Sequence, residues 1–376
     1  EIGWCDWSSD VCSSDLFYSW NSSFYFQSYL KTSNYYLSLT DFKTLHSFDS
    51  NYELYLGYMC LQWIKEINKL SIDSKTLELW DRAYEVEKSL STAKIRLDLE
   101  KLNNLSESSP YIEELKNTLD EEHISQDYNG TDKVTGRIYA AKESNGFNIQ
   151  TLPEVLKEVV IPESQSILYE YDYKYFEFCL LSQICGVDYK TDPHLELSQY
   201  LFKTDEYRAV CKTINYAIIY GKSIDSTISE IKKNFPNLKT NYLVLYDKLI
   251  QVTKPFEELK QSLIEEYKKH RVLYNYYGRN IYPQKEEYVF LNNYIQSTAA
   301  DFIILKIQKL NKYLQQYPSI NKILLQKHDS ILFNLSIGLI QTTSIVKDIE
   351  TILTSPEDKL VGQISLKSGK NWKELS

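Results

Sequence analysis

Two aspartates stand where short apolar segments end, and carboxylates in such places can bind a metal ion. Asp172 ends the alternating, apolar segment Ser166–Asp172, which predicts a buried strand. Asp329 lies inside Ile323–Leu335, which predicts two apolar strands joined by a turn. An acid at such a turn is costly unless it has a ligand, so the pair predicts a site for a divalent cation. Taken singly, each has a simpler interpretation, namely a helix-capping Asp and an ordinary turn.

A predicted helix over Glu206–Tyr220 carries two cations and two aromatic rings at steps of four residues. They are Arg208, Lys212, Tyr216 and Tyr220. Such steps keep the side chains on one broad helical face, with a drift of about 40° per step. Arg and Lys neutralise phosphate charge and aromatic rings stack on bases, so this face fits a nucleoside triphosphate. The alternative is an ordinary amphipathic helix whose cations extend to water.

A second predicted helix, Asn292–Leu310, begins with an amide-rich run. The amides of Asn292 and Gln296 could bond to the minor-groove acceptors that every correct base pair presents. The small residues Thr298–Ala300 permit close packing against a neighbouring element. Simple helix packing is the alternative interpretation of this segment.

The remaining segments predict an α+β fold. Lys75–Asn103 has helical spacing of apolar residues and predicts a long, exposed amphipathic helix. Phe17–Ser74 is predicted to be mostly helical, and Leu360–Leu375 predicts a strand followed by a turn. Helices dominate, and a small sheet gathers strands from distant parts of the chain, with acids at its strand ends or turns.

The composition of the chain limits its possible functions only weakly. The chain has 376 residues and a net charge of -9, which argues only weakly against nucleic-acid binding, because a basic cleft can lie within an acidic surface. No stretch approaches the roughly 18 apolar residues of a membrane span, so we expect a soluble, cytoplasmic protein without a membrane partner. The six cysteines form no CxxC pair, which favours free thiols in a reducing compartment.

The first sixteen residues differ in character from the rest. Residues 1–16 resemble a translated sequencing adapter and are excluded from fold reasoning, as a cloning scar would be. We therefore expect that the natural start of the gene is missing here.

Taken in order, four segments resemble family A DNA polymerases, the bacterial DNA polymerase I family. The segment around Asp172 resembles motif A of that family, and Arg208–Gly221 resembles its fingers helix. Asn292–Asp301 resembles its minor-groove helix, and His328–Ser330 resembles its motif C. Five shorter segments add to this resemblance: Thr135-Gly136-Arg137, Asn148–Pro153, Asp192-Pro193-His194, Tyr277-Gly278-Arg279 and Gly369–Trp372. The resemblance extends from about residue 132 to the end.

The resemblance implies a right-hand polymerase fold. The palm would comprise residues 132–195 and 291–376, the fingers 196–290, and the thumb with its leading helices 17–131. The implied activity is template-directed DNA synthesis by two-metal nucleotidyl transfer from a dNTP to a primer 3′-hydroxyl. Primer-template DNA and dNTPs would be the partners of a monomeric enzyme with two Mg²⁺ ions. An unidentified processivity factor is a further candidate partner.

The resemblance also implies roles for single residues. The metal ligands and catalytic residues would be Asp172, Asp329, the backbone carbonyl of Tyr173, and Lys212 as the acid for the leaving group. The dNTP would contact Arg208, His194, Tyr216, Tyr173 and Glu177, the last blocking a ribose 2′-hydroxyl. DNA would contact Tyr220, Arg137, Gln150, Arg279, Asn292, Gln296 and His328.

The sequence departs from the family pattern at several positions. Ser330 stands where a Glu usually follows the second Asp, and Lys174, Tyr175 and Cys179 replace Ser, Gln and Arg. Tyr216 stands where bacterial enzymes usually have Phe; some phage and mitochondrial relatives have Tyr. That similarity predicts ready incorporation of dideoxynucleotides.

Two other functions compete with DNA synthesis. A phage-type single-subunit RNA polymerase shares the cationic helix and the His-Asp-Ser turn, but Glu177 would occupy the space that a 2′-hydroxyl needs. An inactive DNA-binding relic is disfavoured because Asp172, Asp329 and Lys212 are all present. No Asp-x-Glu site precedes the thumb-like part, so we expect no 3′–5′ exonuclease in this chain. An upstream exonuclease domain in the natural protein stays open.

Overall fold

The computed structural model describes residues 74–105, 110–131, 135–140, 148–281 and 286–375. It divides into two units, Glu1–Asp81 and Arg82–Ser376. The fold below is that of the second unit. The adapter-like residues 1–16 and the predicted helical region Phe17–Ser74, apart from Ser74 itself, lie outside the described residues.

Helices and strands are mixed along the chain, which confirms the predicted α+β class. The helices are α5 (Ser74–Ser91), α6 (Leu99–Asn104), α7 (Pro110–Asn117), α8 (Phe176–Ile184), α9 (Pro193–Phe202), α10 (Arg208–Ile219), α11 (Ile224–Asn234), α12 (Tyr242–His270), α13 (Phe290–Leu314), α14 (Ile337–Thr342) and α15 (Ile345–Thr354). Short 3₁₀ helices are η2 (Ile149–Thr151), η3 (Glu154–Val159), η4 (Glu287–Val289) and η5 (Trp372–Leu375). The strands are β1 (Lys94–Leu97), β2 (His123–Ser125), β3 (Tyr128–Thr131), β4 (Ile138–Ala140), β5 (Val160–Ile161), β6 (Ser166–Tyr173), β7 (Leu273–Tyr274), β8 (Asn280–Ile281), β9 (Lys322–Lys327), β10 (Ser330–Ser336) and β11 (Ile364–Gly369).

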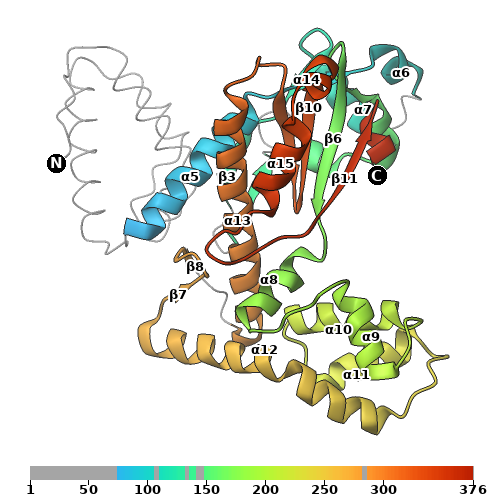
Figure 1. The fold of residues 1–376 in the computed structure, drawn as a ribbon, viewed down its shortest axis with the longest axis vertical. Helices are drawn as coiled ribbons and strands as arrows, with labels where there is room; N and C mark the ends of the chain where they lie inside the picture. Colours follow the sequence, from blue (N-terminus) through green and yellow to red (C-terminus); the bar gives the residue numbers. More distant parts are fainter. Residues whose placement is uncertain (1–73, 106–109, 132–134, 141–147, 282–285, 376) are drawn as a thin grey trace. The chain divides into compact units, whose positions relative to one another are not determined.

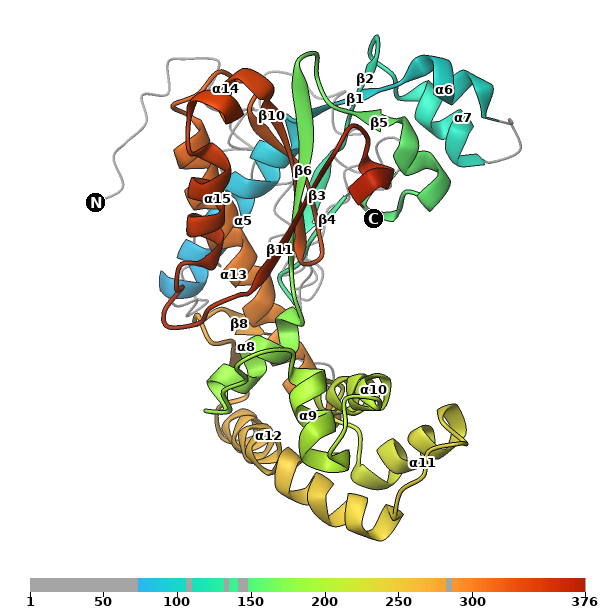
Figure 2. The same ribbon diagram turned by 45° about the vertical axis from the view of Figure 1, so that its right-hand side comes forward.

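A four-stranded antiparallel sheet in the order β11-β6-β10-β9 forms the centre of this unit (Figure 1). Side chains alternate along β6, and Tyr171 and Tyr173 lie on the face that α13 and α15 cover. Their hydroxyls donate to backbone carbonyls of α15, at Val346 and Leu353, each at 2.9 Å. These two bonds fix β6 against the helical layer, which Figure 2 shows on one side of the sheet.

The other face of β6 carries the acids. Glu170 and Asp172 alternate with the buried tyrosines and therefore point away from α13 and α15. Near Glu170 this face is covered by Trp372 of η5, which is buried. Asp172 is exposed, so the sheet opens at the end of β6 where an acid stands.

Helix α10 forms because one of its faces is apolar. Val210, Ile214 and Ile218 are buried at helical spacing. The chain leaves the helix at Gly221, with φ +64°, and a Cβ there would lie 2.4 Å from the carbonyl oxygen of Tyr288. Both the helix and its glycine end confirm the sequence prediction.

The predicted long helix over Lys75–Asn103 is wrong in its second half. Helix α5 ends at Ser91, and Lys94–Leu97 is strand β1, which pairs with β2 and β5. The helix is also partly buried, at Ala83 for example. Local spacing missed the strand because its partners lie 27 to 65 residues further along the chain. Asp98 then starts α6 by capping the backbone N–H of Lys101.

The other predicted elements near the C-terminus are present. The apolar segment Ile323–Leu335 forms the hairpin β9–β10, and Asn292–Leu310 lies within α13. Leu360–Leu375 contains strand β11 and the short helix η5. Within the described ranges, no helix is both long enough and apolar enough to cross a membrane.

Candidate active site

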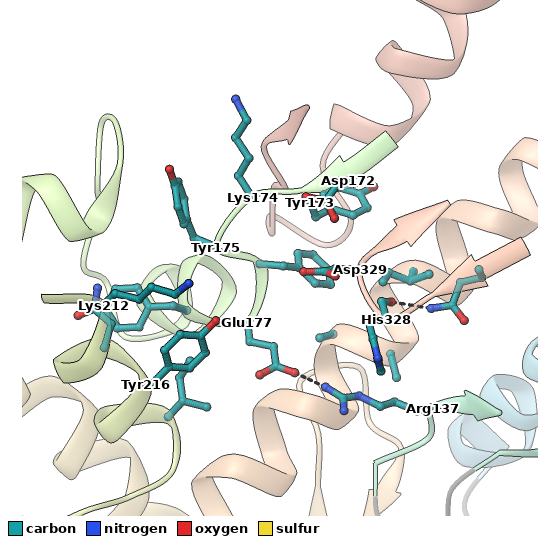
Figure 3. Close-up of a pocket in the computed structure, with 18 of the residues that line it drawn as sticks. Arg137, Asp172, Tyr173, Lys174, Tyr175, Glu177, Lys212, Tyr216, His328 and Asp329 are labelled. Atoms are coloured by element: carbon teal, nitrogen blue, oxygen red, sulfur yellow. Dashed lines mark hydrogen bonds and ion pairs between the residues drawn. The ribbon is translucent and has the colours of Figure 1, made fainter. Parts of the chain in front are cut away.

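A cavity of about 660 Å³ opens beside the end of β6 (Figure 3). Parts of α8, α10 and α13 and the β9–β10 turn form its walls. The structure brings most of the predicted site residues to this one cavity: Arg137, Asp172, Tyr173, Glu177, His194, Arg208, Lys212, Tyr216, Tyr220, His328 and Asp329. Residues separated by up to about half of the chain therefore meet in one place.

Backbone pairing brings the two aspartates together. In the antiparallel register, Ser330 lies opposite Asp172. The backbone N–H of Tyr173 donates to the carbonyl of Asp329 at 3.0 Å. This bond ties the β9–β10 turn to the end of β6. The turn is tight, with His328 in the left-handed region at φ 53°.

Both carboxyls hold their protons more tightly than ordinary aspartates. Partial burial, with the negative charges of Asp329 and Glu170, raises the pKa of Asp172 to about 6. Burial is also the main cause that raises the pKa of Asp329, and the charge of Glu177 adds to it while Arg137 opposes it. Neighbouring like charges in partly dry surroundings favour protonation or a bound cation.

The donor set fits magnesium. In the described part of the chain, no three His, Cys, Asp or Glu side chains gather in a metal-binding cluster. Mg²⁺ does not need one, because it is usually held by one or two carboxylates together with waters and substrate phosphates. Asp172 and Asp329 supply two carboxylates for such a site, and the carbonyl of Tyr173 stays a predicted further ligand.

A third carboxylate lies next to this pair. Ser330 donates its hydroxyl to Oε1 of Glu170 at 3.2 Å, and the indole N–H of Trp372 donates to the same oxygen at 3.4 Å. The charge of Glu170 raises the pKa of both Asp172 and Asp329. Glu170 is therefore part of the electrostatic surroundings of the two aspartates.

Arg208 enters the cavity from the start of α10, where it is held by Asp192. Its Nε donates to Oδ2 of Asp192 at 2.7 Å. The other carboxylate oxygen of Asp192 caps α9 by accepting the backbone N–H of His194 at 2.8 Å. One acid thus links the start of α9 to a cation of α10. The charge of Arg208 remains available to the cavity, since its side chain is 40% exposed.

His194 is a neutral hydrogen-bond donor at the cavity wall. It is 5% exposed, and burial lowers its pKa to about 4. Asn215 of α10 lies with Nδ2 2.8 Å from His194 Nδ1. The amide N–H₂ can only donate, so Nδ1 accepts and the ring proton lies on Nε2.

The exposed face of α10 carries the predicted row of side chains. Lys212 lies with Nζ 5.7 Å from the ring centre of Tyr216. The rings of Tyr216 and Tyr220 are nearly parallel, with centres 6.5 Å apart, and both are close to half exposed. A cation followed by two exposed rings can receive a phosphate and then flat bases.

Glu177 and Arg137 form an ion pair inside the cavity, drawn as a dashed line in Figure 3. Burial raises the pKa of Glu177, and the nearby guanidinium opposes that shift. Glu177 comes from the first turn of α8, while Arg137 precedes β4. The acid therefore projects into the cavity floor with its charge compensated.

Some predicted residues lie elsewhere. Gln150 is buried, and its side chain bonds to the backbone of Ala140, Ile138 and Gln326. Asn292 and Gln296 lie one turn apart on α13 and bond to each other at 3.1 Å. None of these three lines the cavity.

Arg279, which is predicted to contact the template, is buried in this structure. Arg279 is 1% exposed, and its guanidinium pairs with Asp301, which is fully buried. Asn275 also donates to Asp301 at 2.7 Å. In this structure the guanidinium is therefore enclosed and held by an internal ion pair, and the template contact stays a prediction.

Three residues that shape this site were missed, or given no role, when the sequence alone was considered. Asp192 was quoted only within a short motif, and Asn215 and Glu170 were not noticed. Asn215 follows Lys212 by three residues on the same helix, a spacing that could have placed it near the cavity. Glu170 precedes Asp172 by two residues on one strand, so it shares the same face.

The sequence model of DNA polymerase family A matches residues 51–374 of this chain. Two relatives are the DNA polymerase I of Caldicellulosiruptor bescii, 24% identical over 273 residues, and that of Borreliella burgdorferi, also 24% identical over 273 residues. Each alignment covers 65% of this chain but only 31% and 29% of the relative. The chain thus spans about a third of the length of these relatives.

A solved structure shares the fold. The POL domain of Pol1 from M. smegmatis, in complex with a DNA primer-template and a dNTP, matches with a TM-score of 0.56 and 19% identity. The match covers 70% of this chain and 50% of that one. It confirms the predicted right-hand polymerase fold.

Proposed function

The chain belongs to DNA polymerase family A, and on that premise we propose that it catalyses template-directed DNA synthesis. The reaction transfers a nucleotide from a dNTP to a primer 3′-hydroxyl and releases pyrophosphate. Primer-template DNA and dNTPs are the proposed partners of a monomeric, cytoplasmic enzyme, with an unidentified processivity factor as a further candidate.

One observation carries this proposal. The cavity combines two adjacent aspartates at the end of the sheet with two cations and two rings along α10. A dNTP needs this combination, because its charged triphosphate must lie beside the metal while its base stacks further along. The triphosphate would contact Arg208 and the Nε2–H of His194, and the sugar and base would pack on Tyr216.

Asp172, Asp329 and the carbonyl of Tyr173 would hold two Mg²⁺ ions. When bound, the ions activate the primer hydroxyl and stabilise the charge on the departing pyrophosphate. Lys212 would donate a proton to the leaving group. Tyr173 is buried and would support the site chiefly through its backbone.

The remaining roles concern DNA and sugar choice. Glu177 would occupy the space of a ribose 2′-hydroxyl. Tyr220 would stack at the templating position, while Arg137 and His328 would follow the primer terminus. Asn292 and Gln296, which are both partly exposed on α13, would bond to the minor groove outside the cavity. Gln150 is proposed as a further DNA contact.

The same proposal assigns the parts of the hand. The palm comprises residues 132–195 and 291–376, and the fingers 196–290. The thumb and leading helices comprise 17–131, of which the structure describes 74–105 and 110–131. We propose no 3′–5′ exonuclease activity for this chain.

A phage-type RNA polymerase remains the alternative, and the position of Glu177 favours the DNA enzyme. Its carboxylate projects into the cavity from the first turn of α8. A ribonucleotide would have to displace it.

Primer extension tests the proposal. A primed template and Mg²⁺ would be incubated with deoxynucleotides or ribonucleotides, with Asp329→Ala as the control. Extension with deoxynucleotides alone, lost in the variant, is expected. Extension with ribonucleotides would favour the RNA polymerase, and tight primer-template binding without extension would indicate an inactive relic.

A further inference from the structure

Tyr175 connects the strand that carries Asp172 to the helices that carry the proposed phosphate-binding residues. It lies between β6 and α8 and adopts a left-handed conformation, with φ 51° and ψ 31°. A non-glycine residue in that region costs free energy, so its surroundings must hold it there. Figure 3 shows the side chain on the Lys212 side of the cavity, apart from Asp329.

The hydroxyl of Tyr175 completes a triangle of hydrogen bonds. It donates a hydrogen bond to Oδ2 of Asp192 at 2.7 Å and accepts one from Nη2 of Arg208 at 3.3 Å. Arg208 Nε donates to the same oxygen of Asp192. Two of these bonds hold the guanidinium, and the bond between Tyr175 and Asp192 joins the two groups that accept them. Together they restrain a long side chain that would otherwise have many rotamers.

The ring of Tyr175 also contacts the second phosphate-binding candidate. Its centre lies 5.0 Å from that of the His194 imidazole, with the planes at 80°. Asn215 fixes the same imidazole through Nδ1. The tyrosine ring and the amide thus restrain the imidazole, whose remaining N–H is the donor that a phosphate would need.

We propose that Tyr175 is a positioning residue that holds Arg208 and His194 in the geometry required to bind the triphosphate of the incoming nucleotide. This inference rests on the proposed function and adds a residue to it. Tyr175 stands only three positions after Asp172, so it also links triphosphate binding to the strand end that carries the metal-binding acid. The family pattern has Gln at this position, and the tyrosine offers both a ring and a hydroxyl.

Tyr175→Phe removes the hydroxyl alone and gives the sharpest test. The KM for dNTP is expected to rise roughly 5- to 30-fold, while kcat changes less than about 2-fold, because the lost bonds act on substrate binding. The Kd for primer-template DNA should not change. Tyr200→Phe is the matched control, since Tyr200 lies on α9 but its hydroxyl bonds to Gln251 at 3.0 Å, outside the cavity.

A second measurement does not depend on catalysis. The Kd of inorganic triphosphate for the full chain, measured by calorimetry, should weaken in Tyr175→Phe by a similar factor. In an Arg208→Ala background the same change should have a much smaller effect, because the hydroxyl of Tyr175 acts through Arg208 while the ring that contacts His194 is retained. If the wild-type chain did not extend primers, the proposed function would fail, yet this comparison would still decide the role of Tyr175.

The contrary results are distinct. An unchanged or lower KM together with an unchanged triphosphate Kd would overturn the proposal. A fall in kcat and melting temperature with KM unchanged would assign Tyr175 a purely structural role and would overturn it as well.

Discussion

Ser330, the residue directly after Asp329, donates its hydroxyl to the carboxylate of Glu170 on the neighbouring strand at 3.2 Å. Family A enzymes usually have a Glu at position 330. In this chain Ser330 stands there, and Glu170 of β6 places a negative charge beside the two aspartates.

Glu170→Gln should weaken divalent-cation binding. Its charge raises the pKa of both aspartates, so it also increases the attraction of this site for a cation. The Kd of Mn²⁺, measured by electron paramagnetic resonance, is expected to rise roughly 3- to 10-fold. Glu350→Gln makes the same charge change on α15, on the covered side of the sheet, and should leave this Kd unchanged. Equal Kd values for wild type and Glu170→Gln would contradict the prediction.

Arg279→Met should destabilise the fold rather than weaken template binding directly. The substitution leaves Asp301 as a fully buried charge without its main partner, which costs about 3–5 kcal/mol in comparable pairs. Urea denaturation would measure the loss. Lys190→Met breaks an exposed ion pair with Asp188 and should change stability little. Wild-type stability combined with weak DNA binding would restore the template role.

His194 should make stability depend on pH between about 6.5 and 4. Its pKa is about 4 in the folded protein, against about 6.5 when unfolded. In that window the unfolded chain binds a proton that the folded chain does not, so stability falls as the pH falls. The loss approaches roughly 3 kcal/mol near pH 4. The urea midpoint would be measured against pH for the wild type and for His194→Gln. The two curves should diverge only below about pH 6.5, and parallel curves would contradict the lowered pKa of His194.

Glu177→Ala should increase the use of ribonucleotides. It removes the carboxylate from the cavity floor and frees Arg137 from its ion pair. Selectivity, taken as the ratio of kcat/KM for dNTP and NTP, is expected to fall by roughly 10- to 100-fold, or about 1.4–2.7 kcal/mol. Glu177→Gln keeps the side-chain volume while it loses the charge. If Glu177→Gln retains the selectivity and Glu177→Ala loses it, the effect is steric. An unchanged ratio of kcat/KM values in Glu177→Ala would contradict the steric role.

Tyr216→Phe should make the enzyme discriminate against dideoxynucleotides. The Tyr216 hydroxyl stands on the exposed face of α10, where the sugar of the proposed substrate would pack. Wild type is expected to use dideoxy substrates readily, and the variant to reject them by roughly 10-fold or more. Competition of dideoxy with deoxy substrates measures the ratio. Tyr220→Phe is the neighbouring comparison, and strong discrimination by the wild type would be inconsistent with the prediction.

Local sequence patterns were sufficient for the main elements of the site. The alternation of Ser166–Asp172 identified a strand with an acid at its end, and this strand is β6. The four-residue steps from Arg208 to Tyr220 identified one helical face, and α10 presents it to the cavity. Such patterns are readable because strand and helix periodicities depend on neighbours in the sequence.

Other features depended on partners far along the chain. Arg279 is enclosed because Asp301 faces it from α13, 22 residues later. Lys94–Leu97 is a strand because β2 and β5 supply its hydrogen bonds. Sequence spacing shows neither partner, so the ion pair of Arg279 and the strand at Lys94–Leu97 could not be predicted from it.

The sequence by itself determined the kind of chemistry, since it contains two acids at strand ends and a helix face with two cations and two rings. Only the tertiary structure decided how these groups are held. Arg208 is held by Asp192 and Tyr175. Asn215 sets the tautomer of His194. The hydroxyl of Ser330 bonds to the carboxylate of Glu170. Hydrogen bonds between side chains require atoms within about 3.5 Å. Whether two distant residues approach so closely is set by the packing of the elements that carry them.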